Sequence, residues 1–194
     1  MERAPSKTRY HHGDLRAALV EAGLALIEAR TADEVGLREA ARAVGVSATA
    51  VYRHFPDKAA FLGALAAEGL QRLAEAQAAA SEAAGGGAAG FRATGFAYVR
   101  FALANPGLFR LIFSSAAKAP RADWAEHDDD AMRMLLQNAE RLARKDDPEE
   151  ARLFALRAWA LVHGLAVLML DGQLPADEAT IHAAIDGADF NSRT

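Results

Sequence analysis

The chain has 194 residues, of which 52% are hydrophobic, a formal net charge of −4, and no cysteine. This hydrophobic share is large enough to bury a core, which argues against intrinsic disorder. The lack of cysteine excludes disulfides, thiolate metal sites and cysteine nucleophiles, and it favours a cytoplasmic location. Residues 1–14 are polar and basic, without the apolar segment that a secretory signal would need.

Nearly every segment is predicted to be helical, because strand-like β-branched runs are absent and alanine is abundant. In chain order, we expect helices over residues 14–30, 37–44 and 48–55, and then a long helix that begins at 57 and ends within an Ala/Gly-rich stretch at 78–90. Further helices are expected over 91–104, 106–113, 128–144, 148–170 and 175–185. The most apolar stretch, residues 153–170, contains Arg157, His163 and Gly164. It does not fit the roughly 20 mostly apolar residues of a bilayer span, so we predict a buried helix and no membrane partner.

Residues 37–55 carry the pattern of a helix-turn-helix. Ala41 is a small residue where two helices would cross, and Gly45 can adopt the left-handed conformation of the turn. The positions predicted to be exposed are hydrogen-bond donors with a basic bias, as contacts with phosphates and base edges require. They are Arg38, Ser47, Thr49, Tyr52, Arg53, His54 and Lys58. The spacing alone also fits a helical hairpin with a glycine corner, in which Tyr52 is a packing ring and His54 a helix C-cap.

The run from Gly45 to Lys58 resembles the recognition segment of TetR-type repressors. The family pattern is Gly-Val-Ser, a variable triplet, Val/Leu-Tyr-x-His/Tyr-Phe, and then a capped helix beginning near a lysine; this chain has Val-Tyr-Arg-His-Phe at 51–55. Three further segments resemble a TetR subgroup whose C-terminal domain carries a Trp-His-Gly motif. They are Tyr-His-His-Gly-Asp-Leu-Arg at 10–16, Asn-Pro-Gly-Leu-Phe-Arg-Leu-Ile-Phe at 105–113, and Trp-Ala-Leu-Val-His-Gly at 159–164.

The resemblance implies an all-α regulator with two domains. A three-helix helix-turn-helix domain at residues 1–58 would bind double-stranded operator DNA, and a long helix would join it to a helical bundle at residues 59–194. In this family Arg38 would reach a base edge or a nearby phosphate. The start of the recognition helix (Ser47, Ala48 and Thr49) would face the bases, where Ala48 can offer only a methyl group. The residues that would hold phosphates are Tyr52, His54 and Lys58.

The resemblance also implies a cavity for a small effector in the bundle. The expected walls are Tyr98, Phe101, Phe109, Phe113, Met132, Leu135, Trp159 and His163. No cluster of Arg or Lys is aimed at these positions, so we expect a largely apolar ligand that is neutral or weakly cationic. Two alternatives stay open, because a lone histidine in an apolar helix is commonly a hydrogen-bonded core residue and aromatic residues at helical spacing commonly fill a core.

A two-fold operator calls for a homodimer. The helix at 148–170 is apolar almost all round, so one face should pack on the protein's own core and the other on a symmetry-related copy. The residues expected near that seam are Ala151, Phe154, Ala155, Ala158, Val162 and Ile181.

Other motifs carry less weight. Gly85-x-Gly87-x-x-Gly90 matches a dinucleotide fingerprint, but no strand precedes it. His11-His12 and the acidic run at 126–130 fit a solvated arm and a helix N-terminus better than metal ligands. We therefore predict no metal and no cofactor. No nucleophile lies in a pattern with a base, so we also predict no enzymatic activity. The alternative function is a helical scaffold or protein-interaction module that does not bind an operator.

Overall fold

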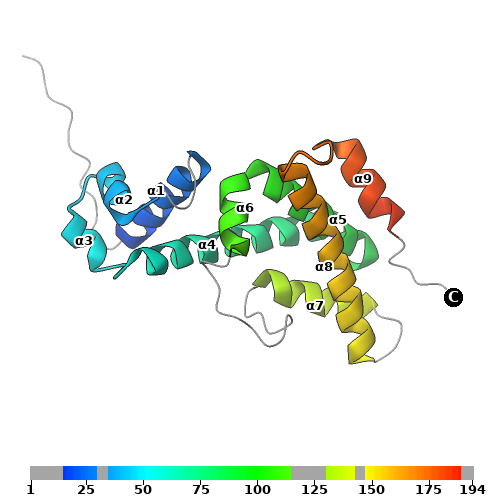
Figure 1. Cartoon of the computed structure of the whole chain (residues 1–194). Helices are drawn as coiled ribbons and strands as arrows, with labels where there is room; N and C mark the ends of the chain where they lie inside the picture. Colours follow the sequence, from blue (N-terminus) through cyan, green and yellow to red (C-terminus); the bar gives the residue numbers. More distant parts are fainter. Residues whose placement is uncertain (1–14, 30–34, 115–129, 143–146, 189–194) are drawn as a thin grey trace, which may run out of the picture. The chain divides into compact units, whose positions relative to one another are not determined.

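The computed structural model describes residues 15–29, 35–114, 130–142 and 147–188. Every regular element in these residues is a helix, which confirms the all-α prediction (Figure 1). The helices are α1 (Leu15–Ala29), α2 (Leu37–Val44), α3 (Ala48–Tyr52), α4 (Lys58–Ala83), α5 (Gly87–Ala104), α6 (Pro106–Phe113), α7 (Asp130–Leu142), α8 (Pro148–Leu170) and α9 (Glu178–Gly187). Contacts divide the chain into two compact units, residues 1–65 and 66–194, so the boundary lies inside α4.

The N-terminal unit is built around the corner between α2 and α3. Gly45 ends α2 with a φ of 77°, and the N–H of Val46 donates to the carbonyl oxygen of Ala41 at 2.9 Å. This left-handed cap turns the chain sharply, as expected for a glycine at that position. Ser47 then caps α3, since its hydroxyl oxygen accepts a hydrogen bond from the N–H of Ala50 at 3.3 Å.

Helix α3 is shorter than predicted. It ends at Tyr52, because the N–H groups of His54 and Phe55 both bond to the carbonyl oxygen of Val51 in a turn, and Pro56 has no N–H with which to continue. Phe55 is buried and meets the buried ring of Phe61 edge-on, with ring centroids 5.1 Å apart. This pair anchors the end of the helix-turn-helix to the first turn of α4.

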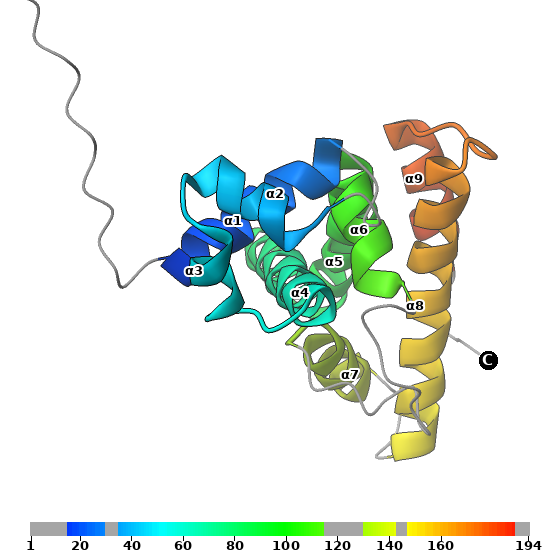
Figure 2. The same ribbon diagram turned by 60° about the vertical axis from the view of Figure 1, so that its left-hand side comes forward.

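The C-terminal unit is a bundle in which α5 packs most extensively on α8 (Figure 2). Leu73 of α4, Tyr98 of α5 and Phe109 of α6 belong to one buried cluster with residues of α8 and α9. Helix α9 begins at Glu178, later than predicted, because Asp177 rather than Pro175 opens it by accepting a hydrogen bond from the N–H of Thr180. The Arg100 guanidinium donates two hydrogen bonds to Glu178, which lowers the pKa of that carboxyl and ties α5 to α9.

A tight turn of three glycines joins α4 to α5. Gly85, Gly86 and Gly87 all have positive φ, and at Gly90 an added Cβ would lie 2.6 Å from Ser81 Oγ. These glycines follow a helix rather than a strand, and they allow two helices to approach closely. Their spacing therefore has a conformational reason within the bundle.

Helix α8 is, among the described residues, the one helix long and apolar enough to cross a membrane, a test that core helices of soluble proteins also pass. Only 33% of its most apolar window is buried in the structure. The face expected at the dimer seam is instead directed inward. Ala151, Ala155, Ala158, Val162 and Ile181 are buried within the protomer, and Phe154 packs on Phe91 with ring centroids 5.2 Å apart. The outward face carries Leu153 and Leu168, which are 46% and 39% exposed.

Candidate nucleic-acid interface and ligand cavity

Seven of the eight side chains predicted to contact DNA are exposed, and Ala48 is half-buried. Tyr52 is 48% exposed, which excludes a role as a buried packing ring. The C-cap of α3 is Arg53, so His54 is not that cap. Ser47 uses its oxygen as an acceptor in the α3 cap, and its hydroxyl proton is left to donate.

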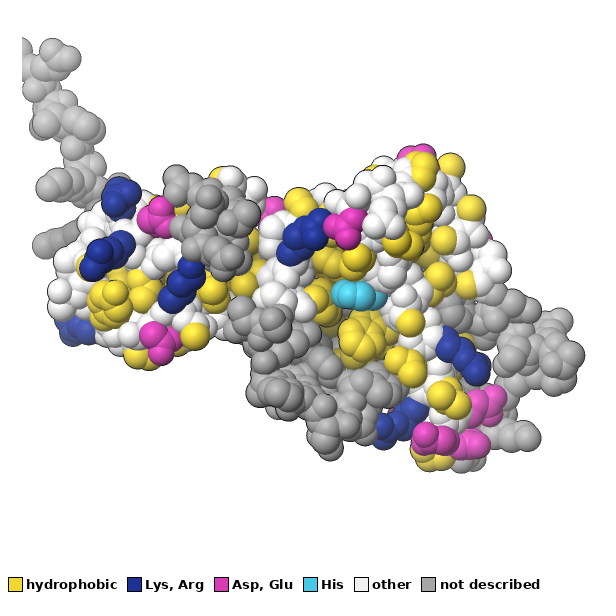
Figure 3. All heavy atoms as spheres, in the orientation of Figure 1, with side chains coloured by type: hydrophobic (Ala, Val, Ile, Leu, Met, Phe, Trp, Pro, Cys, Tyr) yellow, Lys and Arg dark blue, Asp and Glu magenta, His cyan; other side chains and the backbone are white. Residues whose placement is uncertain are grey.

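Three of these residues surround one groove. Arg38, Tyr52 and Lys58 line a hollow of about 580 Å³ between α2 and the start of α4. Arg42, which the sequence prediction omitted, lines it as well. The signal was available, since Arg42 follows Arg38 by four residues and therefore lies on the same helical face. Figure 3 shows basic side chains spread over the visible surface of this unit.

The two carboxylates in the same groove are engaged in helix caps. Glu39 Oε2 accepts a hydrogen bond from the N–H of Gly36 at 3.2 Å, and Asp57 Oδ1 accepts one from the N–H of Ala60 at 2.7 Å. Each carboxylate thus faces a helix N-terminus, where its charge is favourable. The arrangement leaves a surface of cations and neutral donors suited to a phosphate backbone.

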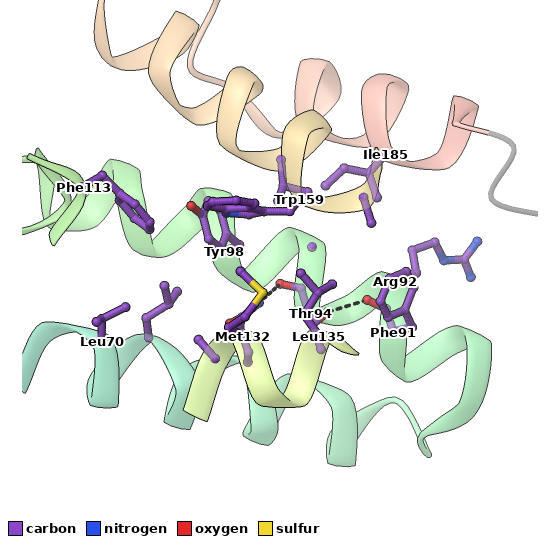
Figure 4. Close-up of a pocket in the computed structure, with 16 residues that line it drawn as sticks. Leu70, Phe91, Arg92, Thr94, Tyr98, Phe113, Met132, Leu135, Trp159 and Ile185 are labelled. Atoms are coloured by element: carbon purple, nitrogen blue, oxygen red, sulfur yellow. Dashed lines mark hydrogen bonds between the residues drawn. The ribbon is translucent and has the colours of Figure 1, made fainter. Parts of the chain in front are cut away.

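The C-terminal unit contains a cavity of about 70 Å³ (Figure 4). Its walls come from α4 to α9 and are mainly aromatic and aliphatic. The lining residues are Leu70, Leu73, Gln77, Phe91, Arg92, Thr94, Gly95, Tyr98, Phe113, Ala131, Met132, Leu135, Ala158, Trp159, Val162 and Ile185. Arg92 is the one charged residue among the described residues of this lining, and its guanidinium points away from the other labelled side chains in Figure 4.

Five of the eight predicted wall residues line this cavity: Tyr98, Phe113, Met132, Leu135 and Trp159. The other three do not. Phe109 is 2% exposed inside the core cluster, and Phe101 packs against the same cluster at its margin. Both follow the helical spacing of the wall residues, but their sides of α5 and α6 meet other side chains rather than the void.

His163 is the third residue off the cavity. Its Nδ1 lies 2.8 Å from the Tyr98 hydroxyl oxygen, and its ring lies 4.7 Å from the ring of Phe113. The histidine is therefore hydrogen-bonded among aromatic rings, which is one of the two roles that the sequence left open. It also borders a separate groove of about 310 Å³ with Phe109, Arg110, Phe113, Val167 and Leu170.

Two polar lining residues were missed by the sequence prediction. Gln77 and Thr94 are 9% and 6% exposed, and both line the cavity. A signal existed for Gln77, because it continues the apolar spacing of Leu70 and Leu73 along α4. Within the described residues, no group of three or more His, Asp or Glu side chains could hold a metal ion. His11, His12 and residues 126–129 lie outside the described part of the chain.

Comparisons with known proteins agree with the division of the chain into an N-terminal and a C-terminal unit. Residues 19–65 match the family described as "Bacterial regulatory proteins, tetR family", and residues 91–187 match "Tetracyclin repressor-like, C-terminal domain". A Rhodococcus sp. RHA1 protein of unknown function is 35% identical, with a TM-score of 0.74 over 93% of this chain and 98% of its own. No curated protein matches the chain.

Two more distant structures share the fold. A TetR family transcription regulator from Marinobacter aquaeolei VT8 is 21% identical, with a TM-score of 0.64 over 90% of this chain and 93% of its own. NalD, the secondary repressor of the MexAB-OprM multidrug efflux pump in Pseudomonas aeruginosa, is 18% identical, with a TM-score of 0.60 over 91% of this chain and 95% of its own. The Trp-His-Gly subgroup stays a prediction. The chain belongs to the TetR family of bacterial transcription regulators and is a DNA-binding regulator with an N-terminal helix-turn-helix.

Proposed function

We propose that the protein is a homodimeric repressor that binds a palindromic operator and is released from it by a small, largely apolar effector. Residues 1–58 would bind DNA, and residues 59–194 would dimerise and hold the effector. The observation that supports this proposal most is the apolar cavity in the same chain as the helix-turn-helix. Concave, mostly apolar sites with few polar groups are typical of small-molecule binding.

The DNA-binding roles follow from the exposed donors. Ser47, Ala48 and Thr49, at the start of the recognition helix, would face base edges in the major groove. The residues that would contact phosphates are Arg38, Arg42, Tyr52, Arg53, His54 and Lys58. The two half-sites of the operator would be about 34–36 Å apart, or a multiple of that distance.

Two substitutions should separate these roles. Lys58→Ala should weaken binding to all duplexes alike and reduce the slope of log affinity against log salt by roughly one unit, because one phosphate contact is lost. Thr49→Ala should instead change the preferred sequence. The measurement is affinity for a selected and a random duplex across a salt series. Arg141→Ala, which removes one exposed cation from α7, is the control and should change neither quantity. Equal affinity of the wild type for both duplexes would contradict operator recognition.

The proposed release works through α4. Lys58 begins this helix shortly after the recognition helix ends. Leu70, Leu73 and Gln77 of the same helix line the cavity. An effector that widens the cavity would displace α4 and separate the two recognition helices of the dimer. A 100-fold preference of the effector for the DNA-free form corresponds to about 2.7 kcal/mol of coupling.

A ligand screen tests the release. Apolar compounds that raise the melting temperature should also lower operator affinity. Ala131→Leu, which adds side-chain volume to the cavity lining, should abolish both effects while leaving operator binding intact. If every stabilising compound leaves operator affinity unchanged, the release mechanism is wrong and only the DNA-binding role remains.

The outward face of α8 is proposed as the dimer seam. It presents Leu153, Ala160, Gly164 and Leu168 at helical spacing, with one exposed cation, Arg157, on the same stripe. An added Cβ at Gly164 would meet nothing within 4 Å. Small residues between two leucines would allow the α8 helices of two copies to approach closely. A second copy of the chain would cover the exposed leucines of this face, so a membrane is not needed to explain them.

A further inference from the structure

Among the described residues, the cavity lining holds one buried side-chain polar atom without a hydrogen-bond partner. Gln77 Oε1 is inaccessible to solvent and has no hydrogen bond. Its neighbour Nε2 donates to the carbonyl oxygen of Thr94 at 3.3 Å, which fixes the orientation of the amide. A buried acceptor without a donor is rare in native proteins, because desolvation is then uncompensated.

Two hydroxyl groups of the cavity lining have hydrogen-bond partners other than this acceptor. The Thr94 hydroxyl donates to the carbonyl oxygen of Phe91 at 2.6 Å. The Tyr98 hydroxyl is engaged with His163 Nδ1. Gln77 and Thr94 both line a cavity whose other walls are largely apolar, and Gln77 Oε1 is an acceptor there without a donor.

We propose that the ligand of this cavity is an apolar molecule with a hydroxyl or N–H group, and that Gln77 Oε1 accepts its hydrogen bond. This inference deepens the proposed effector site and rests on it. Molecules that can only accept, such as ethers, esters and ketones, would leave Gln77 Oε1 unpaired and bind more weakly.

The lining of the cavity also disfavours a negatively charged ligand. Arg92, the one cation in the described lining, has its Nη1 3.6 Å from Asp186 Oδ1, and its side chain is 56% exposed. A carboxylate in the cavity would therefore lack a counter-ion and would face an oxygen acceptor, Gln77 Oε1. The chemistry points to neutral aryl or alkyl alcohols, phenols and neutral amines or indoles rather than to organic acids.

The size and walls of the cavity guide the choice of probe. Its volume of about 70 Å³ is less than half of the roughly 150 Å³ of an engineered apolar cavity that binds benzene. A single ring therefore requires a side chain to move, and Met132 in the wall has the flexible thioether that permits this. Phe91, Tyr98 and Trp159 favour an aromatic guest.

Three isomers of one composition, C7H8O, make the test sharp. p-Cresol and benzyl alcohol can donate a hydrogen bond, and anisole can only accept one. Binding is measured by calorimetry and by thermal stabilisation for the wild type, Gln77→Met and Gln77→Leu. Gln71→Met is the matched control, because it makes the same change at an exposed position of the same helix.

We expect the wild type and Gln71→Met to bind the two donors about three- to tenfold more tightly than anisole. In Gln77→Met and Gln77→Leu the preference should disappear while anisole still binds, which shows that the cavity is intact. Equal binding of the isomers by the wild type, or a preference for anisole, would overturn the inference. So would a donor preference that survives in both Gln77 variants.

The two proposals can fail separately. If p-cresol is preferred through Gln77 but does not change operator affinity, the donor-selective site stands and the release mechanism falls. If none of the three isomers binds to the wild type, the inference and the effector site fall together. If anisole and p-cresol bind equally well and both release DNA, the effector site stands and the role of Gln77 falls.

Discussion

Ala160→Glu and Leu168→Glu should each dissociate the dimer and lower operator affinity by about 100-fold or more. Both side chains are exposed on α8 in the protomer, so the substitutions cost the folded chain little. In a two-fold interface each change occurs twice and places two carboxylates in an apolar contact. Sedimentation at micromolar concentration gives the oligomeric state, and a mobility shift on the selected duplex gives the affinity.

Ala78→Glu is the control for this pair, since it places the same charge at an exposed position of α4. It should leave the protein dimeric and the operator affinity unchanged. Persistence of the dimer in both α8 variants would show that the seam lies on another face. Loss of the dimer with unchanged operator affinity would show that DNA binding does not require two copies.

The alanine substitutions Gly69→Ala and Gly63→Ala should change the free energy of unfolding in opposite directions. At Gly69 an added Cβ would lie 2.6 Å from Leu108 Cδ1 and 2.8 Å from Ile112 Cδ1, and both side chains are buried in α6. Overpacking of this kind costs roughly 1–3 kcal/mol, more than the gain of about 0.5–1 kcal/mol in helix propensity, so the variant should be destabilised. At Gly63, in the same helix, nothing lies within 4 Å of the added Cβ, so alanine should stabilise by about 0.5–1 kcal/mol through its helix propensity.

Urea denaturation of the two variants and the wild type measures the difference. Since both substitutions add one methyl group to α4, helix propensity affects them alike and the contact with α6 separates them. A stabilised Gly69→Ala variant would mean that α4 and α6 can move apart without cost. Its ligand affinity would then be informative, because Leu70 and Leu73 of α4 line the cavity.

The helix-turn-helix could be predicted from the sequence because each of its features is local. Gly45 supplies the left-handed turn, Ser47 the cap and Pro56 the stop, and each acts within a few residues of its own position. The exposure of the predicted DNA contacts follows from the same local geometry. Their contacts with bases and phosphates stay predictions, since these depend on a partner.

The cavity was predicted less completely because helical spacing gives the face of a residue but not its depth. Phe109 and Tyr98 both face the bundle, and their rings meet edge-on, yet of the two Tyr98 lines the cavity and Phe109 does not. That difference depends on how several helices meet, which periodicity within one helix does not contain. The missing partner of Gln77 Oε1 depends in the same way on side chains distant in the sequence.

The sequence did not indicate which face of α8 packs inside the protomer, for a related reason. With apolar residues on every side, the pattern does not say which face packs inward. In the structure the small side chains of Ala151, Ala155 and Ala158 are buried, and the larger Leu153 and Leu168 face outward. Both faces of α8 carry small and large apolar residues, so the contacts with the other helices of the bundle decide its orientation.

The glycine turn between α4 and α5 offers an engineering site. Gly85 and Gly87 are exposed, and an added Cβ at Gly85, Gly86 or Gly87 would contact no neighbouring side chain. Such exposed tips of small residues tolerate insertions well. The helices on both sides of the turn line the cavity, α4 through Gln77 and α5 through Thr94. A circularly permuted fluorescent protein inserted at this turn would therefore report occupancy of the cavity as a change in brightness, which would make the regulator a biosensor for its own ligand.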